Sequence, residues 1–437
     1  MQNFLILLIA GSSIVPLISN VRRLHQSLAG RGELSSVFGV AIVVLGGLLY
    51  EARLVPTGQP AQIAVFGLLL GSVVLQVSRS LSLQTSQAKA AVSVGLFLPA
   101  IISAAMFLVN ALQNVELPLG QSLGRLLAVA ILFLIAVCVA ASRLDLKDIC
   151  RIITISVLVI FLLSSFGHDG WRACDIFKCG PFGAIYTGPF ASENALAIFV
   201  CVAILCTFAS WTGKGSAWTL VPLGLTLYAT ESRTSQLALA GSLTIWVIVV
   251  LWKKAARPVG MDLDVHLRKK AKFIVITILA VFIASFYLLL HAEPASFSNR
   301  GNVWIRGLMA LGGDWWIGLG LDRWTFLQSI GVVPLLFPHS QYLLLLFGGG
   351  VAAVALLFLL FSVATWAASK GSASLGFGAA YIVFLSILGL TEAYWNPMAF
   401  DGHTFLVIPL VFLISITKDP STISPDSNLA TRAPRAW

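Results

Sequence analysis

Residues 226–242 read TLYATESRTSQLALAGS, and a polar cluster at residues 231–236 separates two apolar stretches there. The cluster is conspicuous because the 437-residue chain is 58% hydrophobic and only 11% charged, with a mean hydropathy of +0.92. Soluble domains average about 25% charged residues. The composition therefore predicts an integral membrane protein, in which a carboxylate and a guanidinium between two apolar helices need an explanation.

The apolar runs on either side of this cluster belong to a series along the whole chain. Because a transmembrane helix needs about 20 mostly apolar residues, we predict an all-α, polytopic fold of about 12–14 transmembrane helices. The thirteen runs cover residues 3–19, 36–52, 61–78, 91–110, 122–141, 151–166, 190–211, 217–230, 234–252, 273–291, 341–367, 375–392 and 402–417. They form one integral-membrane unit over residues 1–417. The first run lacks a basic n-region, and we interpret it as a retained span rather than a signal peptide.

Basic residues gather in short segments between alternate runs, most densely at residues 253–272. Cytoplasmic loops carry the excess of Lys and Arg, so the net charge of +10 is read as a topology signal rather than a nucleic-acid surface. The tail at 418–437 is then cytoplasmic, and its composition predicts disorder. Two long segments, 167–189 and 292–340, and the cluster at 231–236 fall together on the extracytoplasmic face.

The polar cluster allows two interpretations. Arg233 either extends to lipid headgroups at the end of a span or binds an anionic group as a guanidinium fork. In the second case Ser232 and Ser235 are candidate supports. If the cluster is helical, Glu231 and Ser235 share a face. Glu231 then either orients Arg233 or only begins the helix.

The second long segment contains SNRGNVWIRGLMALGGDWWIGLGLDRWTFLQ, residues 298–328. Residues 302–311 are expected to form a short helix, which the following Gly-Gly ends. Arg300 and Arg306 supply cations without a run of acids beside them. This segment is therefore a candidate catalytic loop.

Tryptophans are crowded in the same segment. Trp304 and Trp324 either belong to an aromatic belt at the membrane interface or stack on sugar rings. The sequence leaves both interpretations open.

His339 lies at the mouth of the next span, within FPHSQYLLLLFGGG, residues 337–350. An isolated histidine is usually structural. Here Ser340 and Gln341 follow it, and two arginines share its predicted face. A neutral imidazole at this place could take a proton from a hydroxyl group.

The first long segment continues into WRACDIFKCGPFGAIYTGPFASENALAIF, residues 171–199. Four residues separate Cys174 from Cys179 on the predicted oxidising side, which favours a disulfide. Glu193 and Asn194 either only start the next helix or line the site. The chain has no zinc-spaced Cys/His set and no nucleotide, metalloprotease or serine-hydrolase motif, so we expect neither a metal nor a cofactor.

Four segments of the second half together resemble the O-antigen ligase and polymerase superfamily. They are TGPFASENALAIF, TESRTSQLAL, NRGNVWIRGLMAL with GLGLDRW, and PHSQYLLLLFGGGVAAVALL. They follow the family order over residues 180–360. The chain departs from the family at Ser340, where asparagine is common, and in its rather short outer loop.

The resemblance implies a GT-C-like membrane glycosyltransferase of polysaccharide biosynthesis, acting on the outer face of the cytoplasmic membrane. Its implied donor is an undecaprenyl-diphosphate-linked glycan, and its acceptor is a hydroxyl group on a glycan or lipid. Polymerase and ligase remain alternatives. Arginines can stabilise the charge that grows on a leaving diphosphate without a metal, and His339 could activate the acceptor in one inverting displacement.

The candidate residues form two groups. The predicted catalytic residues are His339, Arg233 and Arg300. The predicted substrate contacts are Glu231, Ser232, Ser235, Asn194, Trp304, Arg306, Trp324, Ser340 and Gln341.

A small-solute or anion transporter is the main alternative. It predicts internal repeats and broken helices near the bilayer midplane, whereas the polar residues here gather at one face. We assign no role to a further polar group on that face, Glu392, Trp395, Asn396 and His403.

Overall fold

The chain folds almost entirely into helices. The structure, a computed structural model, describes residues 2–29, 33–52, 59–82, 94–113, 119–142, 144–164, 170–174, 178–256, 263–369 and 372–415. The elements in chain order are α1 (Gln2–Leu28), α2 (Leu34–Glu51), α3 (Gln59–Ser82), η2 (Val94–Phe97), α4 (Leu98–Gln113), α5 (Leu119–Ala141), α6 (Leu146–Ser164), β1 (Trp171–Arg172), β2 (Ile185–Tyr186), α7 (Glu193–Ala209), α8 (Lys214–Thr230), α9 (Arg233–Ala256), α10 (Leu263–Leu290), α11 (Ser296–Leu311), α12 (Leu321–Ser329), α13 (Gln341–Ala368), α14 (Ser372–Thr391), η4 (Thr404–Val407) and α15 (Ile408–Ser415).

Every predicted apolar run coincides with a helix. Within the described ranges, eight helices are long and apolar enough to cross a membrane, namely α1, α2, α4, α5, α9, α10, α13 and α14. The remaining predicted runs fall on α3, α6, α7, α8 and α15, which are not both long enough and apolar enough to be counted among them. The chain is therefore a polytopic membrane protein. The predicted tail at 418–437 and the side chains of residues 253–270 lie outside what the structure describes.

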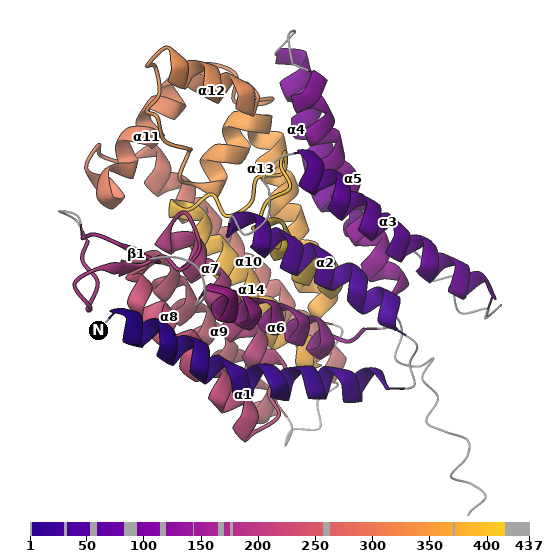
Figure 1. Cartoon of the computed structure of the whole chain (residues 1–437). Coiled ribbons are helices and arrows are strands. Elements are labelled where there is room, and N and C mark those ends of the chain that lie inside the picture. The colour runs from indigo at the N-terminus through magenta and orange to yellow at the C-terminus, as the bar shows by residue number, and fades with distance from the viewer. Residues whose placement is uncertain are drawn as a thin grey trace, which may run out of the picture.

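Helices α13 and α14 form the centre of the bundle (Figure 1). In α14, 89% of the apolar window is buried, compared with 28% in α9 and in α10, which cover it. α14 packs against α7, α9, α10, α13 and α15, and α4 packs against α13 on another side. The start of α13 and the end of α14 are therefore enclosed by protein, and charged groups there require partners.

The long loop, residues 292–340, carries α11 and α12 beyond the start of α13 (Figure 1). The short helix expected at 302–311 is confirmed, and Gly312 follows its last residue. Backbone angles at Phe297, Ser298 and Asn299 are left-handed, so the regular part of α11 begins just after them. This bend directs Arg300 toward the end of α14.

Helix α13 is interrupted inside the bundle at Gly350, where φ is 67° and ψ is −167°. The backbone groups that the interruption frees are bound by the long loop. Leu319 N–H donates to Phe347 O at 2.7 Å, and Val351 N–H donates to Trp315 O at 2.8 Å. Buried backbone groups must be paired in this way, so residues 315–319 are an integral part of the helix packing.

Replacing Gly350 with alanine is expected to lower the stability of the fold by roughly 1–3 kcal/mol. The backbone angle disfavours any side chain, and an added Cβ would collide with the carbonyl group of Trp316. The melting temperature of the purified protein in detergent measures the effect. Gly313→Ala is the matched control, because its added Cβ meets no atom within 4 Å. Equal melting temperatures for the two variants would contradict the role given to Gly350.

Candidate active site

Four chain connections meet at one end of the bundle. They are the α6–α7, α8–α9, α10–α13 and α14–η4 connections. Polar contacts link Asn194 to Ser232, Arg300 to Glu392, and Gln341 to Glu392. The contacts join residues that lie on different chain connections, up to 92 positions apart in sequence, and they define the candidate site.

Arg300 is held at the end of α14. One terminal nitrogen donates to Glu392 Oε1 at 2.7 Å, and the other donates to the carbonyl oxygen of Thr391. The carboxylate is nearly buried, with a side-chain exposure of 10%, against 18% for Arg300. Burial raises the pKa of Glu392, while Arg300 and, more weakly, Lys178 oppose this rise. Two contacts use only part of the five-donor guanidinium, so donors remain for a ligand.

Gln341 fixes the connection that carries Glu392. Its amide donates to Trp395 O at 2.8 Å and accepts from Trp395 N at 2.9 Å. Its backbone N–H donates to Glu392 O at 3.1 Å. The predicted substrate contact Gln341 is thus fully buried and occupied with protein groups. Through these hydrogen bonds Gln341 holds the segment after α14 against the start of α13.

His339 stands just before α13 in a left-handed conformation, with φ of 47°. Ser340 follows as the N-cap: its hydroxyl accepts from Leu343 N and donates to Gly389 O at 3.1 Å. The imidazole is half-buried. Burial, and then the nearby charge of Arg300, lower the pKa of His339 to about 4. The ring is therefore neutral at physiological pH and can accept a proton.

Arg233 begins α9, and its side chain is exposed. Within the described ranges its guanidinium has no ion-pair or hydrogen-bond partner. Glu231 is the C-cap residue that follows α8, and its backbone is left-handed, with φ of 53°. The cluster is thus not one continuous helix, and the shared face expected for Glu231 and Ser235 does not exist. Nor do Glu231 and Arg233, both described, form an ion pair with each other.

Ser232 and Ser235 are buried beside Arg233. The Ser232 hydroxyl donates to Asn194 Oδ1 at 2.9 Å and lies 3.0 Å from the Ser235 hydroxyl. Asn194 is in the first turn of α7, which Ser192 caps by accepting from Ala195 N. Asn194 therefore lies at the start of the helix and also binds the α8–α9 connection beside Arg233.

The α6–α7 connection forms a hairpin loop, residues 170–192, of which 175–177 lie outside the described residues. Strands β1 and β2 pair within it, and Cys174 and Cys179 form a disulfide. Its basic residues reach the buried Glu193: Lys178 Nζ lies 3.0 Å and an Arg172 nitrogen 3.3 Å from Oε1.

Trp304 and Trp324 are both almost completely buried, with exposures of 0% and 1%. Trp324 Nε1 donates to Leu336 O at 3.1 Å, and its ring packs edge-on against Phe347 of α13. Neither ring presents a face on which a sugar could stack in this conformation. Arg306, in contrast, is exposed on α11 and is available to a ligand.

A second polar cluster anchors α12. Asp322 pairs with Arg125 of α5, and Asn110 of α4 donates to its other oxygen at 2.6 Å. The Asp322 N–H donates back to Asn110 Oδ1 at 2.9 Å. This cluster holds the middle of the long loop, while Arg300 and His339 stand nearer its ends.

Glu392, Arg172 and Lys178 join the site although the sequence assigned none of them a role. Glu193, expected either only to start the helix or to line the site, pairs with Arg172 and Lys178. The sequence signal was a carboxylate directly at the boundary of an apolar run. Such a residue indicates an ion pair, because ionisable groups within membrane segments are rare and usually paired. Sequence alone does not say which distant cation provides the partner.

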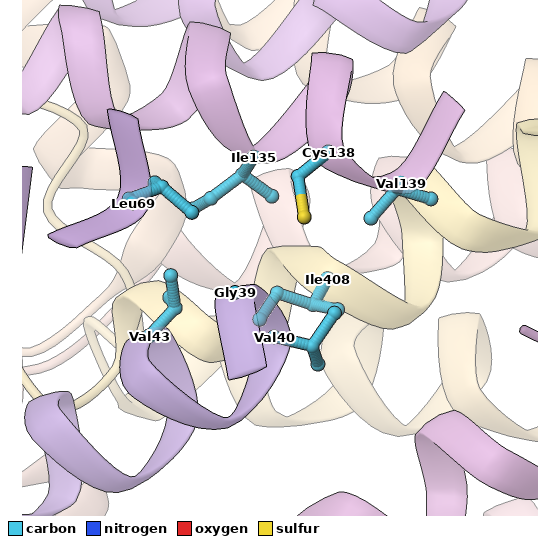
Figure 2. A pocket seen from close by; sticks show the side chains of 8 residues that line it. All are labelled: Gly39, Val40, Val43, Leu69, Ile135, Cys138, Val139 and Ile408. Atoms are coloured by element: carbon cyan, nitrogen blue, oxygen red, sulfur yellow. The ribbon is translucent and has the colours of Figure 1, made fainter. Parts of the chain in front are cut away.

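Figure 2 shows a pocket whose lining includes none of the residues of this charged site. It lies among α2, α3, α5 and α15 and is lined by Gly39, Val40, Val43, Leu69, Ile135, Cys138, Val139 and Ile408. The lining is apolar apart from the Cys138 thiol and holds no cation that could bind a phosphate. We interpret it as a packing gap between helices.

The fold and the site together define a polytopic membrane protein with arginines and a neutral histidine at one end of a helix bundle. Residues 218–358 match the model of the family described as O-antigen ligase. This third of the chain is therefore similar to the O-antigen ligase domain, a family of membrane enzymes of glycosyltransferase type. The match includes Arg233, Arg300 and His339, whereas the resembling TGPFASENALAIF segment precedes it. No curated protein matches this chain.

Replacing Trp324 with alanine is expected to destabilise the protein by roughly 3–5 kcal/mol, because a large core side chain is lost. Trp316→Ala is the matched control, since Trp316 is 76% exposed. Thermal denaturation in detergent compares the two variants. A Trp324→Ala variant with an unchanged melting temperature and a raised KM for glycan would instead support sugar stacking at this ring.

Proposed function

We propose that the chain transfers or polymerises glycan from an undecaprenyl-diphosphate-linked donor to a hydroxyl acceptor. The reaction takes place on the extracytoplasmic face of the cytoplasmic membrane, where lipid-linked glycans and envelope acceptors meet. The O-antigen ligase domain supports the reaction class. The arrangement of His339, Arg300 and Arg233 supports the mechanism.

The observation that carries the proposal is a neutral imidazole held close to a fixed guanidinium. His339 has a lowered pKa of about 4, and Arg300 contributes to that lowering. A neutral base beside a cation suits a reaction in which a hydroxyl group loses a proton while a neighbouring leaving group gains negative charge.

The same end of the bundle is suited to a diphosphate. Helices α7, α9 and α13 all begin here, and N-terminal helix ends favour anions. Arg233 adds an exposed cation at the start of α9 that has no partner among the described residues. Among the described residues, no three His, Cys, Asp or Glu side chains gather as a potential metal site. We assign the stabilisation of the diphosphate to the arginines and to the backbone N–H groups at these helix starts.

In the proposed step, His339 accepts the proton of the acceptor hydroxyl. The acceptor oxygen attacks the anomeric carbon opposite the diphosphate and forms the new glycosidic bond. The bond from that carbon to the diphosphate oxygen breaks, and both electrons leave with the lipid diphosphate. Arg233 and Arg300 stabilise the departing charge, and the single displacement inverts the anomeric centre.

The transporter alternative receives less support. Helix α13 is broken at Gly350, as transporter helices often are. The break is filled by the backbone of residues 315–319. The charged residues instead occupy the helix ends.

Purified wild-type protein in detergent, given undecaprenyl-diphosphate oligosaccharide and no added metal, is expected to form longer or transferred glycan. His339→Ala should lower the rate about 10²–10⁴-fold through loss of the base. Arg233→Ala should lower it about 10²–10³-fold through loss of charge stabilisation. Arg323→Gln, a change at an exposed arginine of α12, is the control. Unchanged transfer by both site variants would contradict the mechanism.

The pH dependence provides a separate test of His339. The base is active when neutral, so activity should fall only as the pH drops through its pKa. The acid limb of kcat/KM should therefore lie near pH 4 rather than near the 6.5 of an ordinary histidine. Replacing Arg300 with glutamine should move this limb upward, because one cause of the lowered pKa is removed.

Glu392 also titrates near this site, and Glu392→Gln separates the two groups. The amide keeps a hydrogen bond to Arg300 but cannot ionise. An acid limb that persists near pH 4 in this variant belongs to His339. A limb that disappears would assign the titration to Glu392 and contradict the proposed base.

A further inference from the structure

We propose that the hairpin loop positions Arg233, with Arg172 and Lys178 acting through Glu193 rather than on the substrate. This inference rests on the proposed function for the role of Arg233 as a diphosphate ligand. It adds a part of the chain that lies outside the O-antigen ligase domain match at 218–358.

The first step is the burial of Glu193. Its exposure is 5%, and both Lys178 and Arg172 contact the same oxygen, Oε1. The other oxygen, Oε2, is buried without a partner among the described residues. An unpaired buried carboxylate is strongly unfavourable. The buried position of Glu193 therefore depends on the two cations that the hairpin loop supplies.

The second step links Glu193 to Arg233. Asn194 is the next residue on the first turn of α7, and its Oδ1 accepts from the Ser232 hydroxyl at 2.9 Å. Ser232 immediately precedes Arg233, and its carbonyl oxygen accepts from Gln236 N at 3.0 Å in the first turn of α9. A shift of the first turn of α7 would therefore release the residue that sets the start of α9.

The hairpin loop also contacts the helix on the other side of this connection. Trp171 packs against Phe182 and Tyr186, and Phe182 packs against Tyr228 of α8, with ring centroids 6.3 Å apart. Helix α8 ends at Thr230, just before Glu231. The loop thus supports the α8–α9 connection through both α7 and α8.

The disulfide determines where the two cations stand. Lys178 is adjacent to Cys179, and Arg172 is two residues before Cys174. Lys178 and Glu193 also influence the pKa of Glu392, in opposite directions, so their pair stands close to the Arg300–Glu392 pair. Opening the disulfide would loosen the cations that neutralise Glu193, and through Glu193 and Asn194 the start of α9, without changing any catalytic side chain chemically.

The first experiment measures donor kinetics in the full-length protein. The double variant Arg172→Gln/Lys178→Gln should raise the KM for the lipid-diphosphate donor about tenfold with a smaller change in kcat, as expected when a charged contact to substrate is misplaced. Adding Glu193→Gln should restore the wild-type KM, because no buried charge then needs neutralising. Lys214→Gln, at the opposite end of α8, is the control.

Rescue separates the positioning role from direct binding. If Arg172 and Lys178 contact the substrate themselves, Glu193→Gln cannot restore the KM, and the inference is overturned. If the double variant has wild-type KM and kcat, the inference is also overturned.

The second experiment uses the disulfide and a readout that does not depend on activity. Reduction of wild-type protein should raise the donor KM and increase hydrogen exchange in residues 231–236. The Cys174→Ser/Cys179→Ser variant should show both changes without reductant and no further response to it. Unchanged exchange on reduction would overturn the inference. Absence of transfer by the oxidised wild type would instead contradict the proposed function, while the exchange measurement would still test the coupling.

Discussion

The arrangement of the site depends on one electrostatic constraint, which is that a carboxylate enclosed by helices must be paired with a cation. Glu392, Glu193 and Asp322 are three such carboxylates, and each receives its cation from outside its own helix. Buried ion pairs contribute little net stability because desolvation offsets their attraction, yet breaking one is strongly unfavourable. They therefore select one arrangement of the connections over others. The ion pairs of Glu392 and Glu193 hold Arg300 and the hairpin loop against the ends of α14 and α7.

A second constraint, the pairing of buried backbone groups, makes the long loop part of the bundle. The interruption of α13 exposes Phe347 O and Val351 N, and residues 315–319 pair with both. Asp322 fastens the next segment to α4 and α5. A loop of this length would otherwise be expected to move. Because it is fixed in its middle as well as near its ends, Arg300 and His339 can keep a constant relative position, which catalysis by a base and a charge stabiliser requires.

The sequence predicts the helices well because their length follows from bilayer thickness and their composition from the absence of water. It also identifies Arg233, Arg300 and His339 as candidates, since isolated charges beside apolar runs stand out. It does not reveal that Glu392 binds Arg300 or that Glu193 binds Lys178, because ion pairs between different elements leave no periodic signal in the sequence. Trp304 and Trp324 show the opposite difficulty. Tryptophan is common at membrane interfaces, in sugar sites and in protein cores, and only the burial of both rings in the structure assigns them to the core.

The charges at the site also connect the strength of the base to the presence of the donor. In the free protein, burial and the charge of Arg300 keep His339 a weak base. In the proposed complex, the diphosphate lies against the same guanidinium. Its negative charge reduces the positive potential that Arg300 exerts on the imidazole of His339. One of the two causes that lower the pKa is thereby reduced, so the base becomes stronger once a donor is bound. The phosphate charge of the donor itself thus raises the basicity of His339. Proton transfer is then favoured only when substrate is present, without a separate conformational switch.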